Sequence, residues 1–71
     1  MKWWARHKQK RNLELYNNGY DYACGSLLRG EHTPLSLEAL IPELGKNHFD
    51  FGMLDAIDKV VSLGIVADDR F

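Results

Sequence analysis

The sequence predicts an all-α fold, a compact three-helix bundle in which the first and third helices cross at glycines. Three observations support this prediction. Residues 3–28 contain no proline, and their apolar positions follow helical spacing. Two later segments begin at residues that commonly cap helices, Thr33 and Asn47. Finally, an aromatic residue, a glycine and an alanine recur 33 positions apart, in YNNGYDYA at 16–23 and in FDFGMLDA at 49–56.

The first helix should run from Trp3 to about residue 29. Arg29 followed by Gly30 is typical of a helix end, with a cation in the last turn and then a glycine in the left-handed region. Residues 1–11 are the weakest part of this prediction, because the basic start of the chain can fray as an extension.

The second helix should occupy residues 34–44. Thr33 can cap its first free amides, and Pro34 suits the first helical position because proline lacks an N–H. Pro42 should kink or split this helix near Ile41, since it removes a backbone donor and clashes one turn back. Gly45 would close the segment.

The third helix should begin after Asn47, with Asp50 placed to reach back to the cap amide. It should end at Leu63-Gly64-Ile65 in a Schellman-type turn. We expect residues 65–71 to form a short tail, held on the body by the apolar residues Ile65, Val66 and Phe71.

The repeat predicts where the helices touch. On a helix, residues at i, i+3 and i+7 share one face, so each copy presents a ring beside two small residues. Glycine within a helix costs about 1 kcal/mol relative to alanine, and close approach of two helices would compensate. The predicted crossing or interface residues are Tyr16, Gly19, Tyr20, Ala23, Phe49, Gly52 and Ala56. The alternative is that one glycine notch faces a ligand or a second subunit.

Length and charge limit the classes of protein to consider. We expect residues 1–71 to form a single helical domain, small enough for self-association to be a common remedy for a thin core, and we therefore expect a homo-oligomer. Charged residues interrupt the start of the chain and no long apolar run follows, which predicts a cytoplasmic protein without a membrane span. Residues 1–30 carry a net charge of +4 and residues 31–71 a net charge of −5, so the two halves are electrically opposite.

No pattern for catalysis, metal or cofactor binding stands out. His7, His32 and His48 lack the spacing of a zinc site, and the single cysteine, Cys24, falls on the apolar stripe. No phosphate-binding glycine motif occurs. We therefore expect a protein that is not an enzyme and needs no cofactor.

The basic, aromatic start of the chain is the strongest binding candidate. Its cations can contact phosphates and its tryptophans can stack on bases, or the same residues can bind an acidic protein groove or the acidic half of another subunit. They can also simply cover the end of the bundle. The predicted binding residues are Trp3, Trp4, Arg6, Lys8, Lys10 and Arg11.

The stretch YNNGYDYACGSLLRGE, with FDFGMLDAID downstream, resembles small accessory proteins of tailed bacteriophages and prophages. The shared core reads aromatic-x-x-Gly-Tyr-x-x-Ala-x-Gly-x-Leu-Leu-Arg-Gly. The resemblance implies a host-takeover or anti-defence role, in which a small fold inhibits or sequesters a bacterial host component by stoichiometric contact inside the host cell. The alternative is an oligomeric sponge for a nucleotide second messenger or a nucleic acid.

Overall fold

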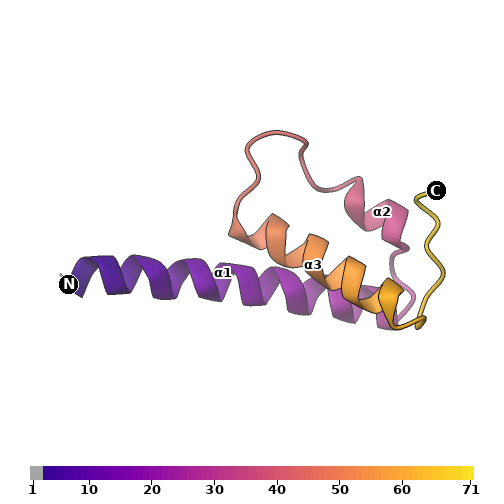
Figure 1. The fold of residues 1–71 in the computed structure, drawn as a ribbon, viewed down its shortest axis with the longest axis horizontal. Coiled ribbons are helices and arrows are strands. Elements are labelled where there is room, and N and C mark those ends of the chain that lie inside the picture. Colours follow the sequence, from indigo (N-terminus) through magenta and orange to yellow (C-terminus); the bar gives the residue numbers. More distant parts are fainter. Residues whose placement is uncertain (1–2) are drawn as a thin grey trace.

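Residues 3–71 fold into three helices (Figure 1). The computed structural model describes the backbone of residues 3–71 and the side chains of residues 10–71. Helix α1 spans Trp3–Leu28, α2 spans Pro34–Glu38 and α3 spans His48–Ser62. Residues 3–71 contain no strand, and α3 packs closely along α1 while α2 packs on α3. The predicted all-α bundle is therefore confirmed.

Helices α1 and α3 run in the same direction and cross at Gly19 and Gly52, as predicted (Figure 1). A Cβ atom on Gly19 would overlap the carbonyl oxygen of Phe49, and one on Gly52 would overlap the carbonyl oxygen of Tyr16. Only glycine leaves room for such close backbones. Ala23, one turn after Gly19, is fully buried and continues the interface.

The side chains beside the crossing repeat the same internal symmetry. On one flank, the Tyr16 hydroxyl of α1 donates a hydrogen bond to the Asp55 carboxylate of α3. On the other flank, Phe49 of α3 packs against Tyr22 of α1, with ring centroids 6.1 Å apart. Adding 33 to Tyr16 and to Tyr22 gives Phe49 and Asp55, so each flank pairs corresponding positions of the two helices. The repeat is thus an approximate two-fold relation between α1 and α3.

Both long helices end in the same way. Gly30 and Gly64 have φ of 72°, the left-handed conformation that favours glycine. After α3, the Ile65 amide donates to the Val60 carbonyl and the Gly64 amide to the Val61 carbonyl, which completes the predicted Schellman turn.

The caps of α2 and α3 also agree with the sequence. Thr33 caps α2, and its hydroxyl oxygen accepts a hydrogen bond from the Ser36 amide. Asn47 caps α3, and the Asp50 carboxylate accepts a hydrogen bond from the Asn47 amide in return. Each cap satisfies amides that the first turn leaves without helical partners.

The predicted extent of the second helix was wrong. We expected residues 34–44, but α2 ends at Glu38. The reason is Pro42, whose ring would clash with the carbonyl four residues earlier, and that carbonyl belongs to Glu38. Residues 39–47 form an irregular loop instead, anchored by the buried Ile41. Parallel packing of α1 and α3 requires such a return path, because the chain must travel back to where α3 begins.

The prediction for the tail was partly wrong. Val66 packs against the core as expected, but Ile65 and Phe71 are exposed. The hydrophobic core is formed by eight residues of the two long helices, α2 and the loop: Ala23, Leu27, Leu37, Ile41, Met53, Ala56, Ile57 and Val60.

The first turns of α1 project beyond the rest of the molecule (Figure 1). Helix α1 meets the start of α3 at Tyr16, whose carbonyl lies against Gly52. Residues 3–13 precede this point and have no neighbouring helix among residues 3–71. The molecule measures 45 Å by 23 Å by 18 Å. We call residues 3–13 the arm.

Candidate functional site

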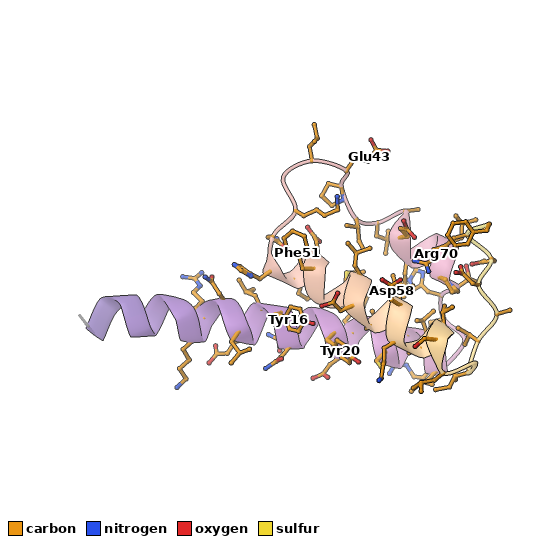
Figure 2. All side chains as sticks on the ribbon, viewed as in Figure 1. Tyr16, Tyr20, Glu43, Phe51, Asp58 and Arg70 are labelled. Atoms are coloured by element: carbon orange, nitrogen blue, oxygen red, sulfur yellow. The ribbon has the colours of Figure 1, made fainter. Side chains whose placement is uncertain are left out.

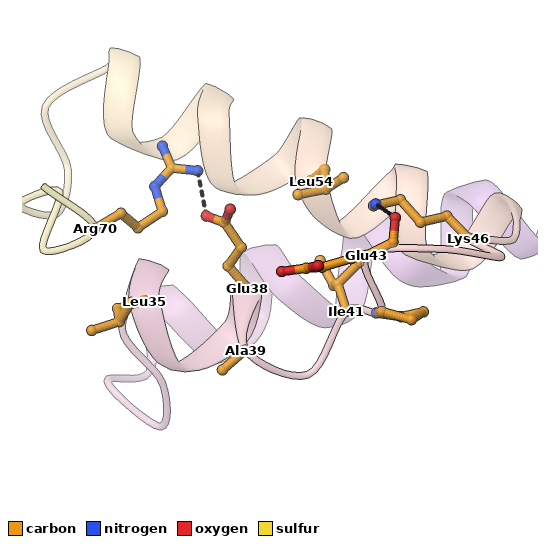
Figure 3. A pocket seen from close by; sticks show the side chains of 9 residues that line it. Leu35, Glu38, Ala39, Ile41, Glu43, Lys46, Leu54 and Arg70 are labelled. Carbon is orange, nitrogen blue, oxygen red and sulfur yellow. Dashed lines mark hydrogen bonds and ion pairs between the residues drawn. The ribbon is translucent and has the colours of Figure 1, made fainter.

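A groove separates the loop and α2 from the outer side of α3 (Figure 3). Its volume is about 490 Å³, and it is open to solvent. Its apolar lining comes from three elements: Leu35 and Ala39 at α2, Ile41 and Pro42 in the loop, and Leu54 on α3. The groove exists because Pro42 ends α2 early. Residues 39–47 therefore form a loop beside α3 instead of continuing the helix.

Four of the nine lining residues are charged, and in Figure 3 the Glu43 side chain points toward Glu38. Arg70 lies near Glu38 at one end, where its Nη1 donates to Glu38 Oε2 over 3.1 Å. Lys46 lies at the other end, where its Nζ donates to the Glu43 carbonyl oxygen over 2.7 Å. The groove lining is therefore mixed, with five apolar and four charged residues.

Arg70 fixes the end of the chain over α2 and α3. Besides Glu38, its guanidinium donates to Asp58 on α3 and to Asp68 in the tail, at 3.2 Å and 2.8 Å. The Arg70 side chain is 14% exposed. Hydrogen bonding to Asp68 raises the pKa of Arg70 above its ordinary value and lowers the pKa of Asp68 below its own.

Asp69 adds a second tie between the tail and α2. Its carboxylate accepts a hydrogen bond from the Leu35 amide over 2.8 Å. A hydrogen bond from the Thr33 side chain, followed by that from the Leu35 amide, lowers the pKa of Asp69 below its ordinary value. Polar contacts therefore hold the tail, where the sequence had indicated apolar ones.

Four large apolar side chains of α2, the loop and α3 are exposed, and one of them, Leu35, lines the groove. Exposure is 52% for Leu35, 57% for Leu40, 88% for Leu44 and 47% for Phe51. Leu40 and Leu44 are chain neighbours of lining residues. Phe51 precedes Leu54 by one turn on the same side of α3, and Figure 2 shows it beneath the loop that carries Glu43. We call the groove lining together with Leu40, Leu44 and Phe51 the groove face.

Sequence reasoning missed the groove face. The available signal was the leucine content of residues 35–44, LSLEALIPEL, which holds more large apolar residues than one short helix can bury. Reading Pro42 as a stop instead of a kink would have left Leu40 and Leu44 without a helix to place them in the core.

The predicted binding residues lie on the arm, away from the groove face. Lys10 and Arg11 are exposed on α1. The side chains of Trp3, Trp4, Arg6 and Lys8 lie outside the described residues. The structure does not bring the arm of a chain to its own groove, because α1 carries it away from the body (Figure 1).

The predicted crossing residues do come together, at the interface of α1 and α3. Gly19, Ala23, Gly52 and Ala56 are buried there, and Tyr16, Tyr20 and Phe49 are half-buried beside them. The backbone of the opposite helix fills each glycine notch, so neither notch has room for a ligand.

Among the described residues, no group of three histidine, cysteine, aspartate or glutamate side chains is placed to hold a metal ion. His32 pairs with the Ser36 hydroxyl at 2.9 Å, and Cys24 is a half-buried free thiol. In residues 3–71, no helix combines the length and the apolar character needed to cross a bilayer.

Comparison with known proteins gives this geometry no parallel. No family model, no curated protein and no solved structure matches the chain.

Proposed function

We propose that the protein acts by binding and without catalysis, and that it inhibits or sequesters a bacterial host protein of anti-phage defence by stoichiometric contact. The observation that supports this best is the groove face, which combines a groove with five apolar lining residues and the exposed side chains of Leu40, Leu44 and Phe51.

The groove face has the makeup of a surface that accepts an amphipathic helix. Such a helix would place its apolar side chains on the five apolar lining residues and its polar ones beside the charged lining residues, which are Glu38, Glu43, Lys46 and Arg70. Burying a leucine or phenylalanine side chain is worth about 1.5 to 3 kcal/mol. A few such contacts at the centre of an interface usually supply most of the binding free energy.

The resemblance to bacteriophage and prophage accessory proteins supplies the biological setting. A single exposed face is enough to occlude a surface of a host protein. The cytoplasm of the bacterial host cell is the compartment that this role requires.

A second candidate is an anionic ligand, a nucleotide second messenger or a nucleic acid, bound by the arm. The observation that favours it is the exposure of Lys10 and Arg11 on a helix that projects from the body. Salt separates the two candidates. Affinity for a nucleic acid would fall by orders of magnitude with ionic strength, while a largely apolar protein contact would change little.

Affinity capture from bacterial lysate tests the first proposal. The full chain serves as bait beside two variants, Leu44→Asp on the groove face and Leu63→Asp at the end of α3, where 60% of the leucine is exposed. Neither substitution removes a buried side chain, so both variants should fold. We expect one host protein to be captured at a fixed molar ratio by the wild type and by Leu63→Asp, and lost with Leu44→Asp. Equal capture by Leu44→Asp would refute the groove face as the contact.

A further inference from the structure

We propose that a second copy of this chain covers the groove face, with the arm of each copy lying on the groove face of the other. This inference rests on the proposed function only because both concern the groove face. A host protein would have to displace the second copy from that surface.

Charge complementarity is the first argument for this occupant. Residues 1–15 carry five bases and one acid, a net charge of +4. Residues 31–71, which carry the groove face, have eight acids and three bases, a net charge of −5, and the groove lining itself holds two acids and two bases. Both bases of the lining already donate within the chain, Lys46 to a backbone carbonyl of the loop and Arg70 to carboxylates of α2, α3 and the tail. Opposite net charges of this size attract the arm of one copy to the groove face of another. They also repel one arm from another arm and one groove face from another.

The arm also needs a partner for its own stability. In proteins, the packing of an apolar face supplies most of the stability of a helix. The arm has no neighbouring helix within the chain, and Leu13 at its base is 59% exposed. A second copy offers the arm an apolar surface on a region of opposite net charge.

The exposed area agrees with one missing interface. The chain exposes 5197 Å². A folded monomer of this mass typically exposes about 4,500 Å², so the excess is about 700 Å². A standard interface buries about 800 Å² on each partner. The projecting arm and the uncovered groove face therefore expose roughly the area that one interface would bury.

We infer that the copies are related by a two-fold axis, which is the arrangement that pairs both arms. If one arm lies on the partner's groove face and the axis is two-fold, the same rotation brings the partner's arm onto the first groove face. Two identical contacts then form, and no arm or face is left to recruit a third copy.

Sedimentation velocity across a range of micromolar concentrations tests the proposal with three forms of the full chain. The wild type should sediment as a dimer that dissociates as salt is raised. The arm variant Lys10→Glu/Arg11→Glu should bind itself about tenfold more weakly or worse, because two attractive contacts become repulsive in each half of the dimer. Adding Glu43→Lys to that variant should restore part of the affinity. All three positions are exposed, and circular dichroism checks that each variant is folded.

Lys59→Glu is the matched control. Lys59 lies five residues after Leu54, about 140° around α3 from the groove, and its charge is likewise exposed. Its reversal should leave the dimer intact. A wild type that stays monomeric at every concentration, or an arm variant that dimerises as well as the wild type, would overturn the proposal. Neither result bears on capture of a host protein by the groove face, which Leu44→Asp tests separately.

Discussion

Replacing Gly19 by alanine tests whether the helix crossing organises this fold. A Cβ atom at this position would overlap the Phe49 carbonyl, which is backbone and cannot rotate away. Overpacking of this kind costs typically 1 to 3 kcal/mol, and a rigid neighbour puts the cost near about 3 kcal/mol. Alanine returns about 1 kcal/mol through its higher helix propensity. The net expectation is a loss of about 2 kcal/mol.

Gly25 provides the control within the same helix. A Cβ atom there would meet Arg29 Nη1 at 2.7 Å, the far end of an exposed side chain that can move. Gly25→Ala should therefore keep the gain in helix propensity and be neutral or stabilising by up to about 1 kcal/mol.

Thermal unfolding of both variants, followed by circular dichroism, measures the difference. For a domain of this size a loss of 2 kcal/mol lowers Tm by about 10 °C. The sign of the change in stability at Gly19 is decisive. If Gly19 had no packing role, alanine there would stabilise the protein as it does at Gly25. A Gly19→Ala protein as stable as the wild type would refute the close crossing. The pair Gly19→Ala/Gly52→Ala should cost less than the sum of its parts, since one separation of the helices relieves both overlaps.

Three further predictions concern single contacts. Ser26 is fully buried and its hydroxyl has no hydrogen-bond partner among the described residues. Ser26→Ala should therefore leave the free energy of unfolding in urea unchanged or raise it by about 1 kcal/mol. A fall of about 1 kcal/mol would contradict this expectation. Asn47→Ala removes the cap of α3 and should cost about 1 kcal/mol, seen as a Tm lower by roughly 4 to 8 °C; an unchanged Tm would count against the cap. Because their folded pKa values are lowered, Asp68 and Asp69 contribute stability that is complete above about pH 5 and is lost as pH falls below the ordinary aspartate value of about 3.9. Amide hydrogen exchange at Leu35, which donates to Asp69, should therefore quicken on acidification relative to other capped amides.

The sequence was sufficient to predict the parts of the fold that depend on local chemistry and on the repeat. Caps and helix ends were predictable because Thr33, Asn47, Gly30 and Gly64 act through their own backbone and its nearest neighbours. The crossing was predictable because mid-helix glycines are costly, and two of them 33 residues apart required a shared explanation.

The groove face and the tail could not be predicted in the same way, because they depend on long-range placement. Nothing near Arg70 in sequence indicates that its guanidinium meets Glu38 and Asp58, which lie 32 and 12 residues away. The groove likewise exists only because α1 and α3 are parallel, which sends the loop back across α3. Helical spacing predicts which face of a helix is apolar, but it does not give the direction of one helix relative to another.

Native mass spectrometry of the protein purified gently from bacterial cells is the most direct test of the central claim, that the groove face binds a host protein. The wild type should carry one host protein at a fixed ratio, the Leu40→Asp/Leu44→Asp variant should lose it, and Leu63→Asp should keep it. A wild type that carries only nucleotide-sized mass, or a groove-face variant that retains the host protein, would contradict the account.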